Sequence, residues 1–311
     1  MAIELYLQGD CSGATRRGTG ISSCIEEEGE PIGFANVPKG WNIPTSGSLP
    51  TEAEFKALIQ DRKVFPFRDK FEFEDLTPEN GVETSSFGIE KSNLLGKPKF
   101  RFQFKDSREF HVNAYDQIGY KKWDVIFYFE KGIGFATDIG ETKLSGFNGG
   151  DWSVATRKFK TGETGAYTDI MFQLLNAEEF NKRMVFYTWE QLGYDASAIN
   201  GVINAKLSYQ TAPVAGSTVN VYVKVDQNRS VDVLGLTDAN NWSVGGTQTT
   251  PASVDSVSYH ADGYYVITLD NALVSTDTIK LSLADVSNGY EAAENASGDL
   301  YSGETPVATI S

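Results

Sequence analysis

Histidine and cysteine are the side chains best suited to acid–base, nucleophilic or metal chemistry, and both are scarce in this sequence. The only histidines are His111 and His260, which fall in different predicted domains. Serine and cysteine proteases hold a nucleophile beside a histidine base. Two histidines in different predicted domains give little support for such a site. We interpret His111 as a surface residue of a strand. Phosphate-binding glycine loops and zinc-protease motifs are also missing. We therefore expect no enzymatic activity and no cofactor.

The two cysteines, Cys11 and Cys24, lie in a stretch rich in glycine, serine and threonine. Their spacing, with no histidine beside them, fits no zinc-ligand pattern, and two cysteines cannot complete a four-ligand structural site. Two interpretations stay open. The cysteines form a disulfide that closes this loop, or they remain free thiols.

Carboxylates are plentiful, since 42 Asp and Glu residues against 27 Lys and Arg give a formal net charge of −15. This charge disfavours tight contact with a phosphate backbone, so we expect no sequence-specific binding of nucleic acid. Glu72, Glu74, Asp124 and Glu130 could meet across strands like the acid pair of a glycosidase, but no motif surrounds them. We expect no catalytic pair and no metal site.

The stretch from Pro98 to Trp189 is where the sequence predicts the main sheet. Phe100–Phe104 alternates aromatic and polar residues, which predicts one buried face. Trp123–Phe129 is almost wholly apolar towards its end, which predicts burial on both faces. Further predicted strands, separated by glycine-rich turns, are Glu109 to Tyr115, Trp152 to Phe159, Ala166 to Leu175 and Met184 to Trp189. We predict an antiparallel β-sandwich or barrel.

The preceding part of the chain is predicted to supply an arm, a helix and a loop. Residues 1–50 are rich in Gly, Ser, Thr and Pro, which predicts an extended arm without a core of its own. Thr51 and Glu54 match a capping box and predict one short helix over Thr51–Ile59. Asp75 to Gly96 is a long polar stretch, in which Asn80-Gly81 is a hairpin turn signal.

The composition changes near residue 202. From Ile203 to Ser311 the chain has 4 Lys and Arg against 12 Asp and Glu, and short strand-like runs alternate with turn signals. This pattern is typical of an immunoglobulin-like sandwich. We therefore predict a mainly β protein with three parts: the arm (1–50), an aromatic-rich antiparallel β domain (51–202) and an immunoglobulin-like β-sandwich (203–311).

No run of about 18 apolar residues is present, so we expect no membrane-spanning segment. The N-terminus lacks the basic start and apolar core of a secretory signal, which indicates folding in a cytoplasm.

The layout of arm, helix, aromatic sheet with a long polar loop, and C-terminal immunoglobulin-like domain resembles phage virion proteins, most nearly the major tail tube protein of long-tailed phages. The resemblance implies a homo-oligomeric ring, often of six subunits, whose inner sheets form a continuous β-barrel around a channel for DNA. Rings stack through long loops and terminal arms, and the immunoglobulin-like domain decorates the outside. The implied location is the virion, and the implied partners are further copies and other virion proteins.

Candidate assembly contacts come from exposed tryptophans and from the predicted stacking loop, Asp75 to Gly96. Trp41, Trp152 and Trp242 lie in or beside predicted loops, where large aromatic side chains are suited to contact a partner. The stacking loop adds Asn80, Val82, Phe87, Leu94 and Leu95. Within the virion class, a capsid decoration or head fibre protein is the nearest alternative. A carbohydrate-binding adhesin module and a glycosidase-like enzyme are the alternatives outside it.

Overall fold

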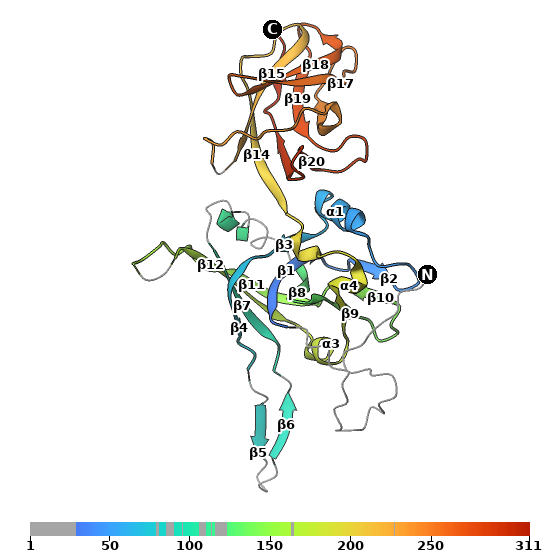
Figure 1. Ribbon diagram of the computed structural model, residues 1–311, viewed down its shortest axis with the longest axis vertical. Coiled ribbons are helices and arrows are strands. Elements are labelled where there is room, and N and C mark those ends of the chain that lie inside the picture. Colours follow the sequence, from blue (N-terminus) through green and yellow to red (C-terminus); the bar gives the residue numbers. More distant parts are fainter. Residues whose placement is uncertain are drawn as a thin grey trace. The chain divides into compact units, whose positions relative to one another are not determined.

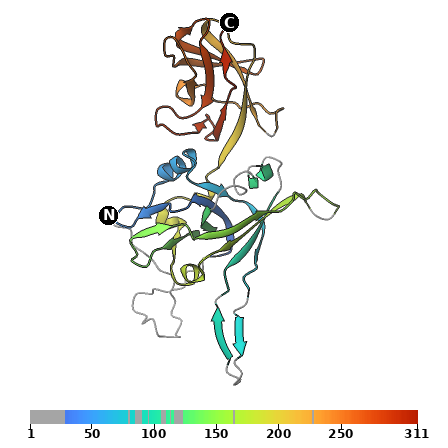
Figure 2. The same ribbon diagram turned by 180° about the vertical axis from the view of Figure 1, so that it is seen from behind.

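The computed structural model describes residues 29–78, 81–84, 90–94, 96–105, 110–112, 114–115, 123–162, 165–226 and 228–311, and is drawn in Figures 1 and 2. The protein is mainly β, with several antiparallel sheets and few helices, which confirms the predicted fold class.

The chain divides into two compact units. The first comprises the described residues up to Phe55 together with Val64–Ile199, and the second comprises Lys56–Lys63 and Asn200–Ser311. The second unit takes in Lys56–Lys63, which the sequence interpretation placed in the central domain. An ion pair of 2.6 Å between Lys56 and Glu294 holds this short segment within the second unit.

The first unit contains a 7-stranded antiparallel sheet, which we call the large sheet. Its strand order is β2-β10-β9-β8-β1-β3, with β13 paired to β9. The bounds are β1 Pro31–Pro38, β2 Asn42–Pro44, β3 Phe65–Phe67, β8 Trp123–Phe129, β9 Gly132–Thr137, β10 Lys143–Ser145 and β13 Met184–Thr188.

A 4-stranded antiparallel sheet, which we call the small sheet, has the order β11-β12-β7-β4. Its strands are β4 Lys70–Asp75, β7 Lys99–Lys105, β11 Gly149–Val154 and β12 Tyr167–Leu174. The two sheets share one phenylalanine-rich core, to which the small sheet contributes Phe100, Phe102, Phe104, Ile170 and Phe172. This confirms the buried aromatic face predicted for β7, although Gln103 on its other face is buried as well.

Strand β8 is buried at every position, as its apolar run predicted. Phe127 and Phe129 belong to the core shared with the small sheet, whereas Ile126 and Tyr128 are buried on the opposite face. Successive side chains of a strand point to opposite faces, so this strand is covered on both sides.

Part of the predicted arm, residues 1–50, forms strand β1 instead. Pro31–Pro38 lies inside the large sheet, between β8 and β3, and Phe34 is fully buried. The glycine that makes this segment look like a loop is required by packing, because a Cβ at Gly33 would lie 2.3 Å from the carbonyl oxygen of Phe67. Interpreting this part of residues 1–50 as an arm was therefore wrong.

Helix α1 spans Glu52–Gln60 and begins with the predicted capping box. The backbone N–H of Thr51 donates to Glu54 Oε2 at 2.8 Å, and the N–H of Glu54 donates to Thr51 Oγ1 at 3.3 Å. The sequence predicted one short helix, but the structure contains others. These are α3 Ala177–Lys182, α4 Trp189–Leu192 and the 3-10 turns η1 Ala196–Ala198 and η2 Ala239–Asn241.

The strand predicted over Glu109 to Tyr115 is wrong, because its described residues, 110–112 and 114–115, are helical. Phe110 packs against Phe104, with ring centroids 5.0 Å apart, and Ala114 is fully buried. These two apolar residues lie one helical turn apart, so a helix directs both towards the core. His111 is half-buried in this helical segment, not on a strand surface.

The predicted loop from Asp75 to Gly96 contains a two-stranded sheet. Strands β5 (Gly81–Thr84) and β6 (Glu90–Leu94) pair antiparallel, with Gly81 opposite Leu94. The sequence anticipated a hairpin here but placed its turn at Asn80-Gly81. Gly81 instead begins the first strand, and Asn80 lies outside the described residues.

The second unit is the predicted immunoglobulin-like sandwich. One sheet has the order β14-β15-β18-β17 and the other contains β16, β19 and β21. In conventional lettering these are strands A, B, E, D and C, F, G of a constant-type domain. The strands are β14 Val202–Tyr209, β15 Gly216–Val225, β16 Trp242–Gly245, β17 Val254–His260, β18 Tyr264–Leu273, β19 Thr278–Leu283, β20 Ala293–Glu294, β21 Leu300–Glu304 and β22 Ala308–Thr309.

Strand β14 joins the two sheets of this unit. It pairs in parallel with β21 over Val202–Asn204 and antiparallel with β15 over Ala205–Tyr209. Trp242, on β16, is 2% exposed and lies in the core, 5.5 Å from the ring of Tyr265. A buried tryptophan on strand C is a hallmark of this fold.

Candidate assembly surface

The outer face of the small sheet is polar, in contrast to the phenylalanine core beneath it. Arg101 on β7 makes an ion pair of 2.7 Å with Glu74 on β4. In the next row across the sheet, Gln103 is flanked by Glu72 on β4 and by Asp169 on β12. The sheet therefore has one apolar face and one polar face, on which Gln103 and Asp169 are each only 7% exposed.

Strands β4 and β11 end the small sheet, with no further strand of the described residues paired outside them. No described strand pairs with these outer edges, although the backbone of Gly149, at the start of β11, is already bonded to Asp124 and Lys39. Proteins cover such edges, twist them away or pair them with another chain. The two edges are different strands, so pairing β4 of one copy with β11 of the next would be a heterologous contact.

The ladder of β4 and β7 continues towards the β5–β6 hairpin. Asp75 is opposite Phe100 at the end of the ladder, and the N–H of Leu76 donates to the carbonyl of Lys99 at 2.8 Å. Figure 1 shows β5 and β6 extending beyond this end of the small sheet. Two candidate contacts, Val82 and Leu94, lie on these strands. Asn80, Phe87 and Leu95 lie outside the described residues.

The candidate tryptophans differ in their surroundings, and the interpretation of Trp242 as a partner contact was wrong, because it is buried in the core of the second unit. Trp152, on β11, packs against the core, with its ring centroid 4.4 Å from that of Phe172 and 5.8 Å from that of Phe34. Its role in the fold is therefore core packing. Trp41 is half-buried and follows the turn after β1, where its N–H donates to the carbonyl of Pro38 at 3.0 Å.

Sequence reasoning missed a basic, aromatic turn between β11 and β12. Arg157, Lys158 and Lys160 surround Phe159, which is 76% exposed. The sequence interpretation assigned Arg157, Lys158 and Phe159 to the end of a strand, although the strand itself ends at Val154. A cluster of cations in a chain of net charge −15 was the signal available in the sequence.

His111 and Asp124, two side chains capable of acid–base chemistry, have structural partners. The Nδ1 atom of His111 lies 3.0 Å from Thr168 Oγ1. Asp124 is held by Lys39 at 3.1 Å and by the N–H of Gly149 at 3.3 Å. The described part of the chain contains no group of three or more His, Cys, Asp or Glu side chains placed to hold a metal ion. None of its helices has the length and apolarity needed to cross a bilayer.

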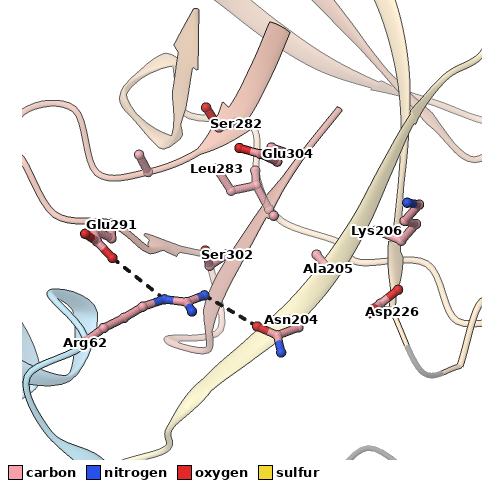
Figure 3. A pocket seen from close by; sticks show the side chains of 12 residues that line it. Arg62, Asn204, Ala205, Lys206, Asp226, Ser282, Leu283, Glu291, Ser302 and Glu304 are labelled. Atoms are coloured by element: carbon pink, nitrogen blue, oxygen red, sulfur yellow. Dashed lines mark hydrogen bonds and ion pairs between the residues drawn. The ribbon is translucent and has the colours of Figure 1, made fainter. Parts of the chain in front are cut away.

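The second unit has an open cavity of about 560 Å³ beside β14, shown in Figure 3. Arg62 reaches into it, with Nε 4.0 Å from Glu291 Oε2 and Nη2 3.4 Å from Asn204 Oδ1. Lys206, Asp226 and Glu304 also line it, and no aromatic side chain is among its lining residues. Sugar sites usually stack rings on aromatic faces, so the lining does not favour a carbohydrate ligand.

The fold defines a mainly β protein with a sandwich and an immunoglobulin-like unit. No protein-family model matches the chain, and no curated protein matches it either. The chain is similar to the crystal structure of the N-terminal part of the bacterial S-layer protein SbsC, with 17% sequence identity and a TM-score of 0.22. The match covers 34% of this chain and 23% of that one, and a TM-score this low supports no inference about fold or function.

Proposed function

We propose that this protein is a non-enzymatic structural component of a phage virion, which self-assembles into rings that stack as a tail tube around a DNA channel. The observation that carries the proposal is the small sheet: it is amphipathic, ends in two different strands, and leads into the β5–β6 hairpin.

The two edges of the small sheet support ring formation. An edge contact between β4 of one copy and β11 of the next rotates each copy by the same angle relative to its neighbour. The copies close into a ring when a whole number of these rotations makes one full turn. Both terminal strands of the small sheet would then be paired, which removes the exposed edges of that sheet. The polar faces of the small sheets would all lie on one side of the closed sheet.

The β5–β6 hairpin supports stacking. It extends beyond the end of the small sheet (Figure 1), where it can reach a subunit in an adjacent ring. The immunoglobulin-like unit has its own core and would decorate the assembly.

The test is negative-stain electron microscopy of the purified protein with light scattering over a concentration series. We expect rings or hollow tubes. Deletion of residues 80–95, bridged by a short Gly-Ser linker, should leave a folded protein that no longer stacks. Tubes that still form from the deletion variant would remove the hairpin from the proposal.

A capsid decoration or head fibre protein is the second candidate, favoured by the self-contained immunoglobulin-like unit. It predicts a dispersed protein at every concentration that binds to capsids. A dispersed protein would therefore reject the tube and favour this alternative.

A further inference from the structure

The turn between β11 and β12 concentrates positive charge on an acidic protein. We call residues 157–160 the basic turn. Its sequence is Arg-Lys-Phe-Lys, in a chain whose formal net charge is −15. In Figure 1 the connection between β11 and β12 projects beyond the body of the small sheet.

The basic turn has a defined geometry. The Nζ atom of Lys158 lies 3.0 Å from the hydroxyl of Tyr167, and the two residues form an isolated β-bridge. These contacts fix the turn to the start of β12. The guanidinium of Arg157 lies 5.5 Å from the centroid of the Phe159 ring, a distance typical of a cation–π contact.

The side chains presented outwards are those found at protein interfaces. Phe159 is 76% exposed, and Lys160 beside it is exposed as well. Aromatic residues and arginine are enriched where binding energy concentrates, whereas an exposed phenylalanine has a cost in water. The flanking cations select for a partner that is acidic.

A second copy of the chain supplies such a partner. Residues 203–311, the immunoglobulin-like sandwich of the second unit, contain 4 Lys and Arg against 12 Asp and Glu, whereas residues 1–202 contain 23 against 30, so the excess of acidic residues is denser on the sandwich. We propose that the basic turn docks onto the acidic second unit of a neighbouring copy. This inference rests on the proposed function, because it requires that copies assemble.

The test compares two single charge reversals in the full-length protein. Lys160→Glu reverses a charge in the basic turn. Lys131→Glu is the matched control, because Lys131 is an exposed lysine in another turn of the same unit, and its side chain has no ion pair within the described residues. Light scattering over a concentration series gives the critical concentration of assembly for each protein.

We expect Lys160→Glu to raise the critical concentration about tenfold, and Lys131→Glu to change it less than about twofold. Phe159→Ser should also weaken assembly. Salt should weaken assembly of the native protein more than that of Lys160→Glu. Salt screens the attraction between Lys160 and the acidic surface, and the variant no longer has this attraction.

Each other outcome overturns the inference. If the native protein assembles and the two reversals behave alike, the docking proposal fails while the proposed function stands. If the native protein stays monomeric at every concentration, both fail. If fluorescence anisotropy shows Lys160-dependent binding of a duplex DNA oligonucleotide, the turn binds phosphate and not an acidic protein surface.

Discussion

The ammonium of Lys39 lies 3.1 Å from the carboxylate of Asp124, which is 7% exposed on the buried strand β8. The same ammonium donates to the carbonyl of Gly149 at 2.8 Å, at the start of β11. One side chain therefore links the turn after β1, a strand of the large sheet and an edge strand of the small sheet.

Removing the cation of this pair should destabilise the first unit. We expect Lys39→Met to lower the free energy of unfolding by about 2 kcal/mol, because Asp124 would keep a buried charge without its counterion. Urea unfolding followed by tryptophan fluorescence measures the change. The double variant Lys39→Met/Asp124→Asn should recover part of the loss, and Lys131→Met serves as an exposed control. Strict additivity of the two single changes would show that the pair is not coupled.

Replacing the buried polar residue Asn36 should stabilise the first unit. It is fully buried on β1, and neither Oδ1 nor Nδ2 has a hydrogen-bond partner within the described residues. Leucine has a similar shape and no polar atoms, so we expect Asn36→Leu to raise the free energy of unfolding by about 1–2 kcal/mol. Thermal unfolding is a suitable measurement, with Asn42→Leu as the control, because Asn42 is exposed on β2 and its amide donates only to the nearby carbonyl of Gly40 at 2.9 Å. A loss of stability would mean that the amide is hydrogen-bonded in solution.

Glu179 should make the stability of the first unit depend on pH. Burial raises its pKa above the usual value, while the N–H of Asn148, which donates to Oε2 at 2.8 Å, opposes this rise. A raised pKa means that the folded protein favours the protonated carboxyl, so this contribution is present at low pH and is lost as pH rises through the folded pKa. We expect Glu179→Gln to be more stable than the native protein at pH 7, with the difference shrinking towards pH 4. Urea titrations at several pH values test this, and a pH-independent difference would contradict it.

Tyr265 anchors a loop in the second unit. Its hydroxyl donates to the carbonyl of Val233 at 2.8 Å and accepts from the N–H of Leu236 at 3.3 Å. We expect Tyr265→Phe to cost about 1–2 kcal/mol, since two buried backbone groups lose a partner. Calorimetry that resolves the unfolding of the second unit measures this cost.

The same tyrosine predicts a response to alkali. Burial raises the pKa of Tyr265 to about 12. The unfolded chain ionises near pH 10, so the stability that the neutral phenol contributes should be lost as pH rises from about 10 to 12. Tyr265→Phe should show a smaller loss over this range than the native protein. Equal losses would assign the effect to other tyrosines.

Local periodicity predicted the elements whose packing follows the sequence pattern. The alternation around Phe102 identified β7, and the apolar run around Ile126 identified a strand buried on both faces. The capping box at Thr51 located the start of α1. In each case the residues that decide the structure are neighbours in the chain.

Elements decided by distant contacts were missed. Strand β1 looks like a loop because of Gly33, whose small size is explained only by the backbone of Phe67 across the sheet. Strand β16 was missed, although Trp242 fills the core of its unit, because it is short and follows a polar turn. The candidate assembly surface was foreseen as a region, the loop from Asp75 to Gly96, but the two edges of the small sheet follow from topology and could not be read from spacing.

The parallel pairing of β14 with β21 determines how the second unit would resist force. Val202 lies opposite Leu300 and Asn204 opposite Ser302, so the first strand of this unit lies beside one of its last. Tension applied between Val202 and Ser311 would pull these two parallel strands past each other along their length. Their interstrand hydrogen bonds would be loaded together in shear, not opened one at a time as in a zipper, and the pairing would act as a mechanical clamp.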